Sequence, residues 1–201
     1  MDLAALLQNI QVEAGVGAGY GQTHAPSNYT NLDKQSSDKS GVLQAYLLAR
    51  NPWIGAEIGM MNLPEYHGHA KTSDYPAYKG LPAGTYPQTA EAQQDITASG
   101  RYGRVNLYGP KVLGIEPYGF YGRARVGTDN HEHAIYNGTD DADFREKLTK
   151  MAKYYGGGVN IPLSDRLKMR AEIGKIPEAS DSYHTVKRDM LMGLIGLGYT
   201  F

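Results

Sequence analysis

The stretch that decides the predicted fold is Met190-Leu191-Met192-Gly193-Leu194-Ile195-Gly196-Leu197-Gly198-Tyr199-Thr200-Phe201. Read with a period of two, one face carries Leu191, Gly193, Ile195, Leu197, Tyr199 and Phe201, and the other carries Met190, Met192, Leu194, Gly196, Gly198 and Thr200. The pattern predicts a strand with one apolar face. Because chain ends fray unless neighbours hold them, so apolar a terminal strand indicates pairing at both edges, as in a closed barrel.

The composition points to an interface between oil and water. The chain has 201 residues, a net charge of -1 and no cysteine, so it suggests neither a nucleic-acid surface nor a disulfide framework. It contains 25 Gly and 16 Tyr but only 3 Phe and 1 Trp. Tyr combines an apolar ring with a polar tip and is enriched at membrane boundaries. We expect one domain over residues 9–201, preceded by an N-terminal extension over residues 1–8.

The sequence contains no uninterrupted apolar run of about 18 residues, so it predicts no transmembrane helix. Its first residues lack the basic region of a secretion signal. The mean hydropathy of -0.48 is typical of a soluble protein. However, a membrane β-barrel exposes only alternate residues to lipid and has polar loops, so a low value fits that class as well.

Eight segments alternate with period two, and their connections alternate in length. The segments are residues 9–22, 41–50, 53–62, 93–105, 115–128, 148–163, 166–176 and 190–201. Long polar connections follow the first, third, fifth and seventh segments, and short ones follow the others. The pattern predicts an all-β fold, an eight-stranded antiparallel up-and-down transmembrane β-barrel. At the end of the fourth segment and just beyond it, Arg104, Val105 and Leu107 break the alternation, which we interpret as a bulge or an interface position.

Alternation alone leaves two barrels open, because the apolar face can point into a core or out to lipid. In a soluble, lipocalin-like ligand carrier the charged face would be in water. In a membrane barrel it would line the lumen, with Glu13, Glu57, Arg101, Arg123, Arg125, Lys168, Arg170 and Glu172 inside. The same face carries many glycines, including Gly15, Gly17, Gly196 and Gly198. An eight-stranded lumen barely holds side chains, so glycine has a purpose there and none on a solvated strand.

The terminal strand, the glycine-rich opening strand from Val12 to Gly21 and the alternation of loop lengths resemble the OmpA-like family of eight-stranded outer-membrane barrels, which includes OmpX. The resemblance implies a bacterial outer-membrane location, both chain ends in the periplasm, and contact with lipid and lipopolysaccharide. It also implies that Tyr199 and Phe201 form the signal read by the barrel-assembly machinery. The family includes adhesins and enzymes, so fold alone does not choose a function.

The predicted lumen charges favour a plug. Five basic and three acidic groups in a narrow interior must pair or be hydrated, since an unpaired buried charge is costly. We expect a salt-bridge network that closes the lumen of a monomeric barrel. The alternative is a narrow pore.

Histidines in the predicted loops raise the question of a metal. His67-Gly68-His69 and His131-Glu132-His133 form two His-x-His sequences, with His24 and His184 in the other long loops. Imidazoles from two hairpins could meet around Zn or Cu. The alternative is that they are solvated loop residues, since loops tolerate almost any residue. No other cofactor is expected.

The remaining hypotheses concern surface function. Ser180, Ser182 and His184 share a loop at the rim where small lipid-A-modifying enzymes place such groups, but their spacing matches no nucleophile and base, so we expect no enzyme. The loop over residues 63–92, with four prolines and four tyrosines, favours instead a structural or adhesin-like role, with a host or cell-surface ligand.

Overall fold

The computed structural model describes the backbone of residues 10–24, 39–71, 91–136, 140–180 and 188–201. The expected N-terminal extension therefore lies outside the described residues. In the described part of the chain, no helix is long and apolar enough to cross a membrane.

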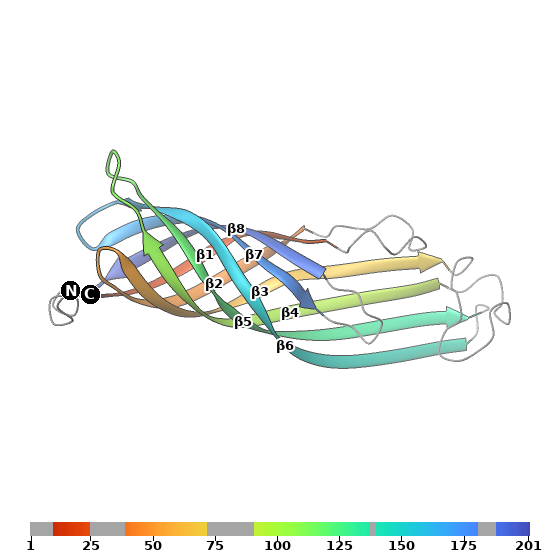
Figure 1. Cartoon of the computed structure of the whole chain (residues 1–201). Helices are drawn as coiled ribbons and strands as arrows, with labels where there is room; N and C mark the ends of the chain where they lie inside the picture. The colour runs from red at the N-terminus through yellow and green to blue at the C-terminus, as the bar shows by residue number, and fades with distance from the viewer. Residues whose placement is uncertain (1–9, 25–38, 72–90, 137–139, 181–187) are drawn as a thin grey trace.

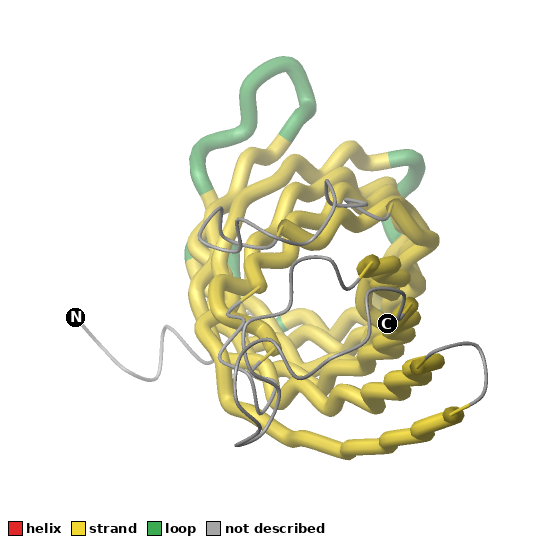
Figure 2. The backbone as a smooth tube through the Cα atoms, turned by 90° about the vertical axis from the view of Figure 1, so that its right-hand side faces the viewer, coloured by secondary structure: helices red, strands yellow, loops and turns green. Residues whose placement is uncertain are grey.

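Eight antiparallel strands form a closed barrel in which each strand pairs with its neighbour in sequence and β1 pairs with β8. The strands are β1 (Gln11–His24), β2 (Lys39–Arg50), β3 (Ile54–Lys71), β4 (Glu91–Tyr108), β5 (Glu116–Tyr136), β6 (Asp140–Pro162), β7 (Leu167–Ser180) and β8 (Arg188–Thr200). Figure 1 shows the barrel from the side, and Figure 2 shows the strands closing around its axis. The predicted fold is confirmed.

The two ends of the barrel differ, as the connection lengths predicted. Residues 51–53, 109–115 and 163–166 make the turns at one end, where β1 also begins and β8 ends (Figure 1). We call this the short-turn end and the opposite one the long-loop end. At the short-turn end the Phe201 amide donates to the Val12 carbonyl at 3.0 Å, which extends the β1–β8 seam to the last residue.

Four strands rise further toward the long-loop end than the alternation predicted. β3 continues to Lys71, and β5 and β6 stay paired up to Tyr136 and Asp140. The prediction of loops over residues 63–71, 129–136 and 140–147 was wrong. Apart from a few residues such as Leu63, these parts are polar on both faces, so they lack the alternation that marks a half-buried strand. The backbone ladders that begin nearer the short-turn end nevertheless continue through them.

The wall of the barrel is apolar outside. Leu43, Ile58, Ile173 and Ile195 are each more than 60% exposed, on four different strands. In β8 the inward face is Met190, Met192, Leu194, Gly196, Gly198 and Thr200, as the sequence predicted. An exposed aliphatic belt around charged inner groups is the reverse of a soluble carrier, so the lipocalin-like alternative does not hold.

Candidate functional site: the lumen and the outer wall

Four charged side chains meet at the centre of the lumen. Glu57 on β3 and Glu172 on β7 flank two arginines, Arg104 on β4 and Arg170 on β7. Arg104 lies 2.9 Å from Glu57 and 2.7 Å from Glu172, and Arg170 lies 2.9 Å and 2.8 Å from the same carboxylates. All four side chains are at most 4% exposed. Each arginine thus bridges both carboxylates, which is the arrangement that offsets the cost of burying charge.

Tyrosine hydroxyls complete the coordination of these carboxylates. Tyr102 donates to Glu57 at 2.7 Å, while Tyr118 and Tyr154 donate to Glu172 at 2.8 and 3.1 Å. The Asn106 amide donates to Glu57 at 2.8 Å. Buried polar groups need such partners, and here the rings that supply them also fill the lumen.

Two further ion pairs lie nearer the short-turn end. Lys168 contacts Glu13 at 2.6 Å, and Tyr46 donates to the other oxygen of Glu13 at 2.8 Å. Arg50 donates two parallel hydrogen bonds, of 2.6 and 2.7 Å, to the Glu116 carboxylate. This bidentate geometry is the strongest form of an arginine–carboxylate contact. We call the eight charged residues of this and the central cluster the lumen network: Glu13, Arg50, Glu57, Arg104, Glu116, Lys168, Arg170 and Glu172. It contains four acids and four bases.

Inward glycines make space for the tyrosine rings. A Cβ on Gly15 would overlap the Tyr46 ring, one on Gly59 the Tyr102 ring, and one on Gly158 the Tyr118 ring. The sequence predicted that lumen glycines leave room for charged groups. The room is taken mainly by the rings that hydrogen-bond to those groups.

The half of the lumen toward the long loops is different in kind. Its buried side chains are mostly aliphatic or methionine and come from six strands: Val42, Met61, Leu63, Ile96, Val126, Ile176, Met190, Met192 and Leu194. All of them except Ile96 belong to the same cluster of buried side chains as the aromatic rings below. The lumen therefore has a charged, hydrogen-bonded half and an apolar half, stacked along the barrel axis.

The structure places five of the eight predicted lumen residues in this network and three elsewhere. Glu13, Glu57, Lys168, Arg170 and Glu172 face inward. Arg101, Arg123 and Arg125 are exposed on the outer wall, so their assignment to the lumen was wrong. Their places are taken by Arg50, Arg104 and Glu116, which the sequence reading missed.

The error has a physical cause in β4 and β5. Their inward residues include Tyr102, Tyr118 and Phe120, rings that we expected to face lipid. Choosing the aromatic face as the outer one placed the arginines inside. The signal that was missed is the regular alternation along β4, which places Arg104 on the same face as Tyr102 and Asn106. β4 pairs with β5 without a break from Glu91 to Tyr108. The bulge expected near Val105 is therefore absent.

The metal hypothesis is not tested by the structure. The backbone register places His67 opposite Asp95 and Asp95 opposite His131. The side chains of His67, His69 and His133, together with the side chain of His24 and all of His184, lie outside the described residues. Among side chains that are described, no three potential ligands gather into a metal site. Zn or Cu binding stays a prediction, and calorimetric titration of the purified protein with zinc tests it.

Two other predictions concern rims of the barrel. The Ser180 side chain, Ser182 and His184 lie outside the described residues, so the structure gives no geometry for an enzyme there. Tyr199 and Phe201 face outward at the short-turn end, 42% and 76% exposed, with ring centroids 5.4 Å apart. Their exposure leaves them accessible, and their role as an assembly signal stays a prediction.

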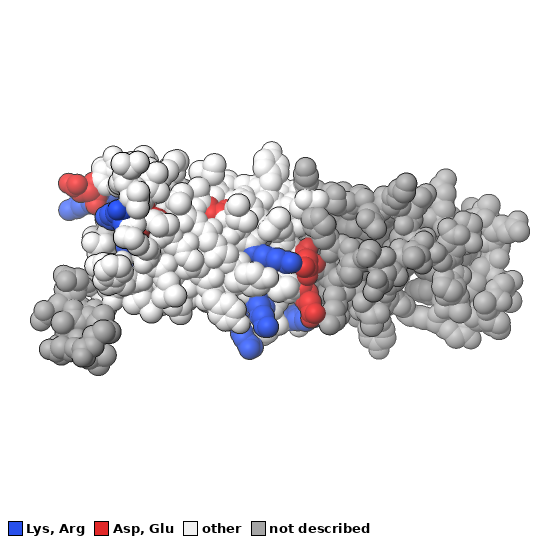
Figure 3. Space-filling view, turned by 45° about the horizontal axis from the view of Figure 1, so that its top comes forward, with Lys and Arg blue, Asp and Glu red and all other residues white. Residues whose placement is uncertain are grey.

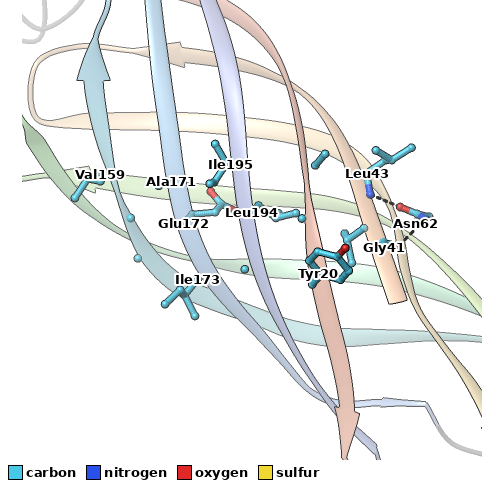
Figure 4. Close-up of a pocket in the computed structure, with 16 residues that line it drawn as sticks. Tyr20, Gly41, Leu43, Asn62, Val159, Ala171, Glu172, Ile173, Leu194 and Ile195 are labelled. Carbon is cyan, nitrogen blue, oxygen red and sulfur yellow. Dashed lines mark hydrogen bonds between the residues drawn. The ribbon is translucent and has the colours of Figure 1, made fainter. Parts of the chain in front are cut away.

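The outer wall has a seam between β2 and β3 (Figure 4). Their backbone ladder stops at the pair Gln44–Met61. Beyond it the Asn62 side chain accepts from the Leu43 amide and donates to the Gly41 carbonyl at 3.2 Å. One amide group thus replaces two ladder hydrogen bonds. It borders a hollow on the lipid-facing wall where small residues such as Ala18, Ala171 and Gly193 lie.

Comparison with solved structures identifies the class. The structure is similar to Neisserial surface protein A (TM-score 0.56, 9% identity, covering 94% of this chain and 97% of that one) and to OprG of Pseudomonas aeruginosa (0.54, 15%, 96% and 97%). It is also similar to Ail, the attachment invasion locus protein of Yersinia pestis, in complex with the heparin analogue sucrose octasulfate (0.51, 13%, 95% and 99%). No protein-family model matches the sequence, and the search of curated proteins gave no match.

These similarities establish a fold. The chain has the architecture of the OmpA-like eight-stranded outer-membrane barrels. Together with the exposed apolar belt, this architecture supports a location in the bacterial outer membrane. Outer-membrane barrels of this size include adhesin-like and channel-like proteins, so function depends on the lumen and on the parts above the membrane.

Proposed function

We propose that the protein is a surface-recognition protein whose lumen does not conduct, and that it binds its partners through the sheet raised above the membrane. The observation that carries this proposal is the height of the strands β3 to β6. Their ladders run to Lys71–Glu91, Glu91–Ile135 and Tyr136–Asp140, far above the last pair of β6 with β7, Tyr155–Lys175. A membrane anchor alone does not need this extension.

The raised sheet offers strand edges. Over residues 140–154, β6 pairs with β5 on one side and has no described strand partner on the other. On the opposite side of the sheet, the ladder of β3 with β2 ends at Met61. Unpaired edges are templates for an added strand, a common way to bind extended peptides. The solved complex of Ail with a heparin analogue supports a recognition role for this architecture, while the low identity leaves the ligand of this chain open.

Trimming the raised hairpin tests the proposal. Residues 128–148 are replaced by Asn-Gly, a two-residue turn that suits the ladder at the pair Gly127–Thr149. The variant retains the lumen network and the apolar belt. We expect adhesion of displaying bacteria to epithelial monolayers and to immobilised heparin to fall by about tenfold, the loss expected when roughly 1.4 kcal/mol of contact energy is removed.

A matched control keeps the strands and changes only their connection, by replacing residues 137–139 with three glycines. This variant should adhere like the wild type. Heat-modifiable gel migration shows that each barrel is folded. Equal adhesion by the trimmed and full-length proteins would overturn the recognition role.

Conductance distinguishes the closed lumen from the alternative of a narrow pore. Four acids and four bases cross the lumen at 2.6 to 2.9 Å, and an apolar layer lies above them. These contacts support a plug that excludes ions. We expect no steady single-channel current in planar bilayers. A reproducible open level would favour the pore.

A further inference from the structure

Four basic side chains form a cluster on the outer wall of the barrel. They are Arg101 on β4, Arg123 and Arg125 on β5 and Lys153 on β6, and all four are exposed. We call them the basic patch. Arg101 lies directly opposite Arg125, and Arg123 lies opposite Lys153. Opposed residues have Cβ atoms about 4.5–5.5 Å apart, and like charges in such pairs destabilise a sheet.

The basic patch lacks acidic partners within the described part of the chain. None of its four residues forms a salt bridge there, whereas every charge of the lumen network does. Higher on the same face of β5, Asp129 is engaged by Lys147 at 3.2 Å. Because like charges on neighbouring strands repel each other, an anion bound from outside the protein would stabilise this part of the wall.

The height of the patch indicates where that anion is. Below Arg101 the outer face of β4 continues with Val105 and Leu107, which face lipid. Below Arg123 and Lys153 come Tyr121 and Tyr155, the residue type that marks a membrane–water boundary. The patch therefore lies just above the apolar belt, on the long-loop side. Figure 3 shows blue and red side chains next to each other at the edge of a broad uncharged stretch of the wall.

A shallow groove joins the patch to the apolar belt. It passes Val16, Ala45 and Met60 and reaches Arg101 and Arg125. These five residues are successive ladder partners from β1 to β5. Because the strands tilt, the row climbs toward the long-loop end: Val16 lies five residues after the start of β1, and Arg125 lies nine after the start of β5. The hydroxyl residues Ser99 and Thr149 line the upper end.

We propose that the basic patch binds the phosphate-bearing headgroup of a glycolipid in the outer leaflet, with one acyl chain along the groove. Guanidinium groups bind phosphate oxygens with paired, charge-assisted hydrogen bonds. The groove is polar and basic at headgroup height and apolar below, which matches an amphiphile better than a soluble anion. This inference is independent of the proposed recognition role, because it uses the wall and not the raised sheet.

The test compares lipids that differ only in phosphate. Full-length protein in detergent micelles is titrated with lipid A and with enzymatically dephosphorylated lipid A, and bound lipid is counted by native mass spectrometry. We expect the phosphorylated lipid to bind the wild type about tenfold more tightly, as the loss of one or two charge-assisted hydrogen bonds implies. The quadruple variant R101Q/R123Q/R125Q/K153Q should lose this preference. The control K111Q removes one charge from the exposed turn at the other end and should keep it.

Three results would overturn the proposal. The first is equal binding of the two lipids, and the second is an unchanged preference in the quadruple variant once heat-modifiable migration has shown it folded. The third is displacement of lipid A by an equal concentration of inorganic phosphate, which would make the patch a site for a free anion. A preference that persists in the presence of phosphate, and exceeds that for phosphatidylglycerol, supports a glycolipid site.

Discussion

The two halves of the lumen are filled by different kinds of side chains, one half by charged and hydrogen-bonded groups and the other by apolar groups. Toward the short-turn end, Glu57, Arg104, Arg170 and Glu172 satisfy one another through short ion pairs. Toward the long-loop end, residues such as Leu63 and Met192 pack without polar contacts between their side chains. Directional contacts fix one arrangement and fail when a partner is lost, whereas apolar packing tolerates changes that conserve volume. The two halves should therefore respond differently to substitution.

The largest effect is expected at Glu172. Replacing it with Leu leaves Arg104 and Arg170 sharing one carboxylate, so the free energy of unfolding should fall by about 3–5 kcal/mol, the usual cost of removing one partner from a buried ion pair. Urea titration in lipid vesicles measures it. E172Q keeps one of the two carboxylate oxygens as a hydrogen-bond acceptor, so it should lose less. D165N in an exposed turn should lose almost nothing. A loss under about 1 kcal/mol for E172L would contradict a network held by mutual pairing.

In the apolar half, the free energy of unfolding should depend on the volume of a buried side chain and only weakly on its shape. Leu63 is 1% exposed, and Leu63→Ala should cost about 2–5 kcal/mol through lost transfer energy and the cavity left behind. Leu63→Met conserves volume and should cost less than about 1.5 kcal/mol. Both follow from the same urea titration. Similar losses for the two variants would indicate that this half is as specific as the charged half.

Glycine should matter only where it faces the lumen. A methyl group at Gly15 would overlap the Tyr46 ring, whose hydroxyl holds Glu13, so Gly15→Ala should cost about 1–3 kcal/mol. Gly103 faces outward with nothing near its missing Cβ. Gly103→Ala should therefore stabilise the strand, by about 0.5–1 kcal/mol. Equal effects at the two sites would show that ring packing in the lumen does not limit side-chain size.

The smallest effect concerns a pair at the border of the network. Lys168 is 16% exposed and contacts Glu13 at 2.6 Å. Removing both charges with E13M/K168M should cost less than the sum of the single variants, with a coupling energy of about 0.5–3 kcal/mol. A full double-mutant cycle in vesicles measures this coupling. Additive losses would mean that the two charges are held by water and not by each other.

Period two was enough to predict the barrel, because Leu191, Ile195 and Leu197 alternate with small or inward residues as lipid exposure requires. It was not enough for β4 and β5. There both faces hold large side chains, and Tyr118 looks outward by hydrophobicity but turns inward to bond Glu172. Tyrosine has both an apolar ring and a polar hydroxyl, so its residue type does not indicate whether it faces the lipid or the lumen.

The sequence pattern also could not predict which charged residues in the lumen pair with each other. Arg104 and Glu172 are 68 residues apart, and only closure of the barrel brings them within 2.7 Å. Similarly, the strands above the membrane carry polar residues on both faces, so the extent of the raised sheet depends on ladders begun below. In our proposal, the residues wrongly placed inside, Arg101, Arg123 and Arg125, mark the level of the lipid headgroups.

The seam between β1 and β8 has a consequence for how the barrel assembles. These strands come from opposite ends of the chain, so their contact closes the longest loop and is the slowest to form by topology. On the lumen side the seam opposes Gly15 to Gly198 and Gly17 to Gly196. Two strand ends without side chains at these positions can meet after the tyrosine rings and ion pairs of the other strands are in place. The glycines make late closure compatible with an interior that is already packed.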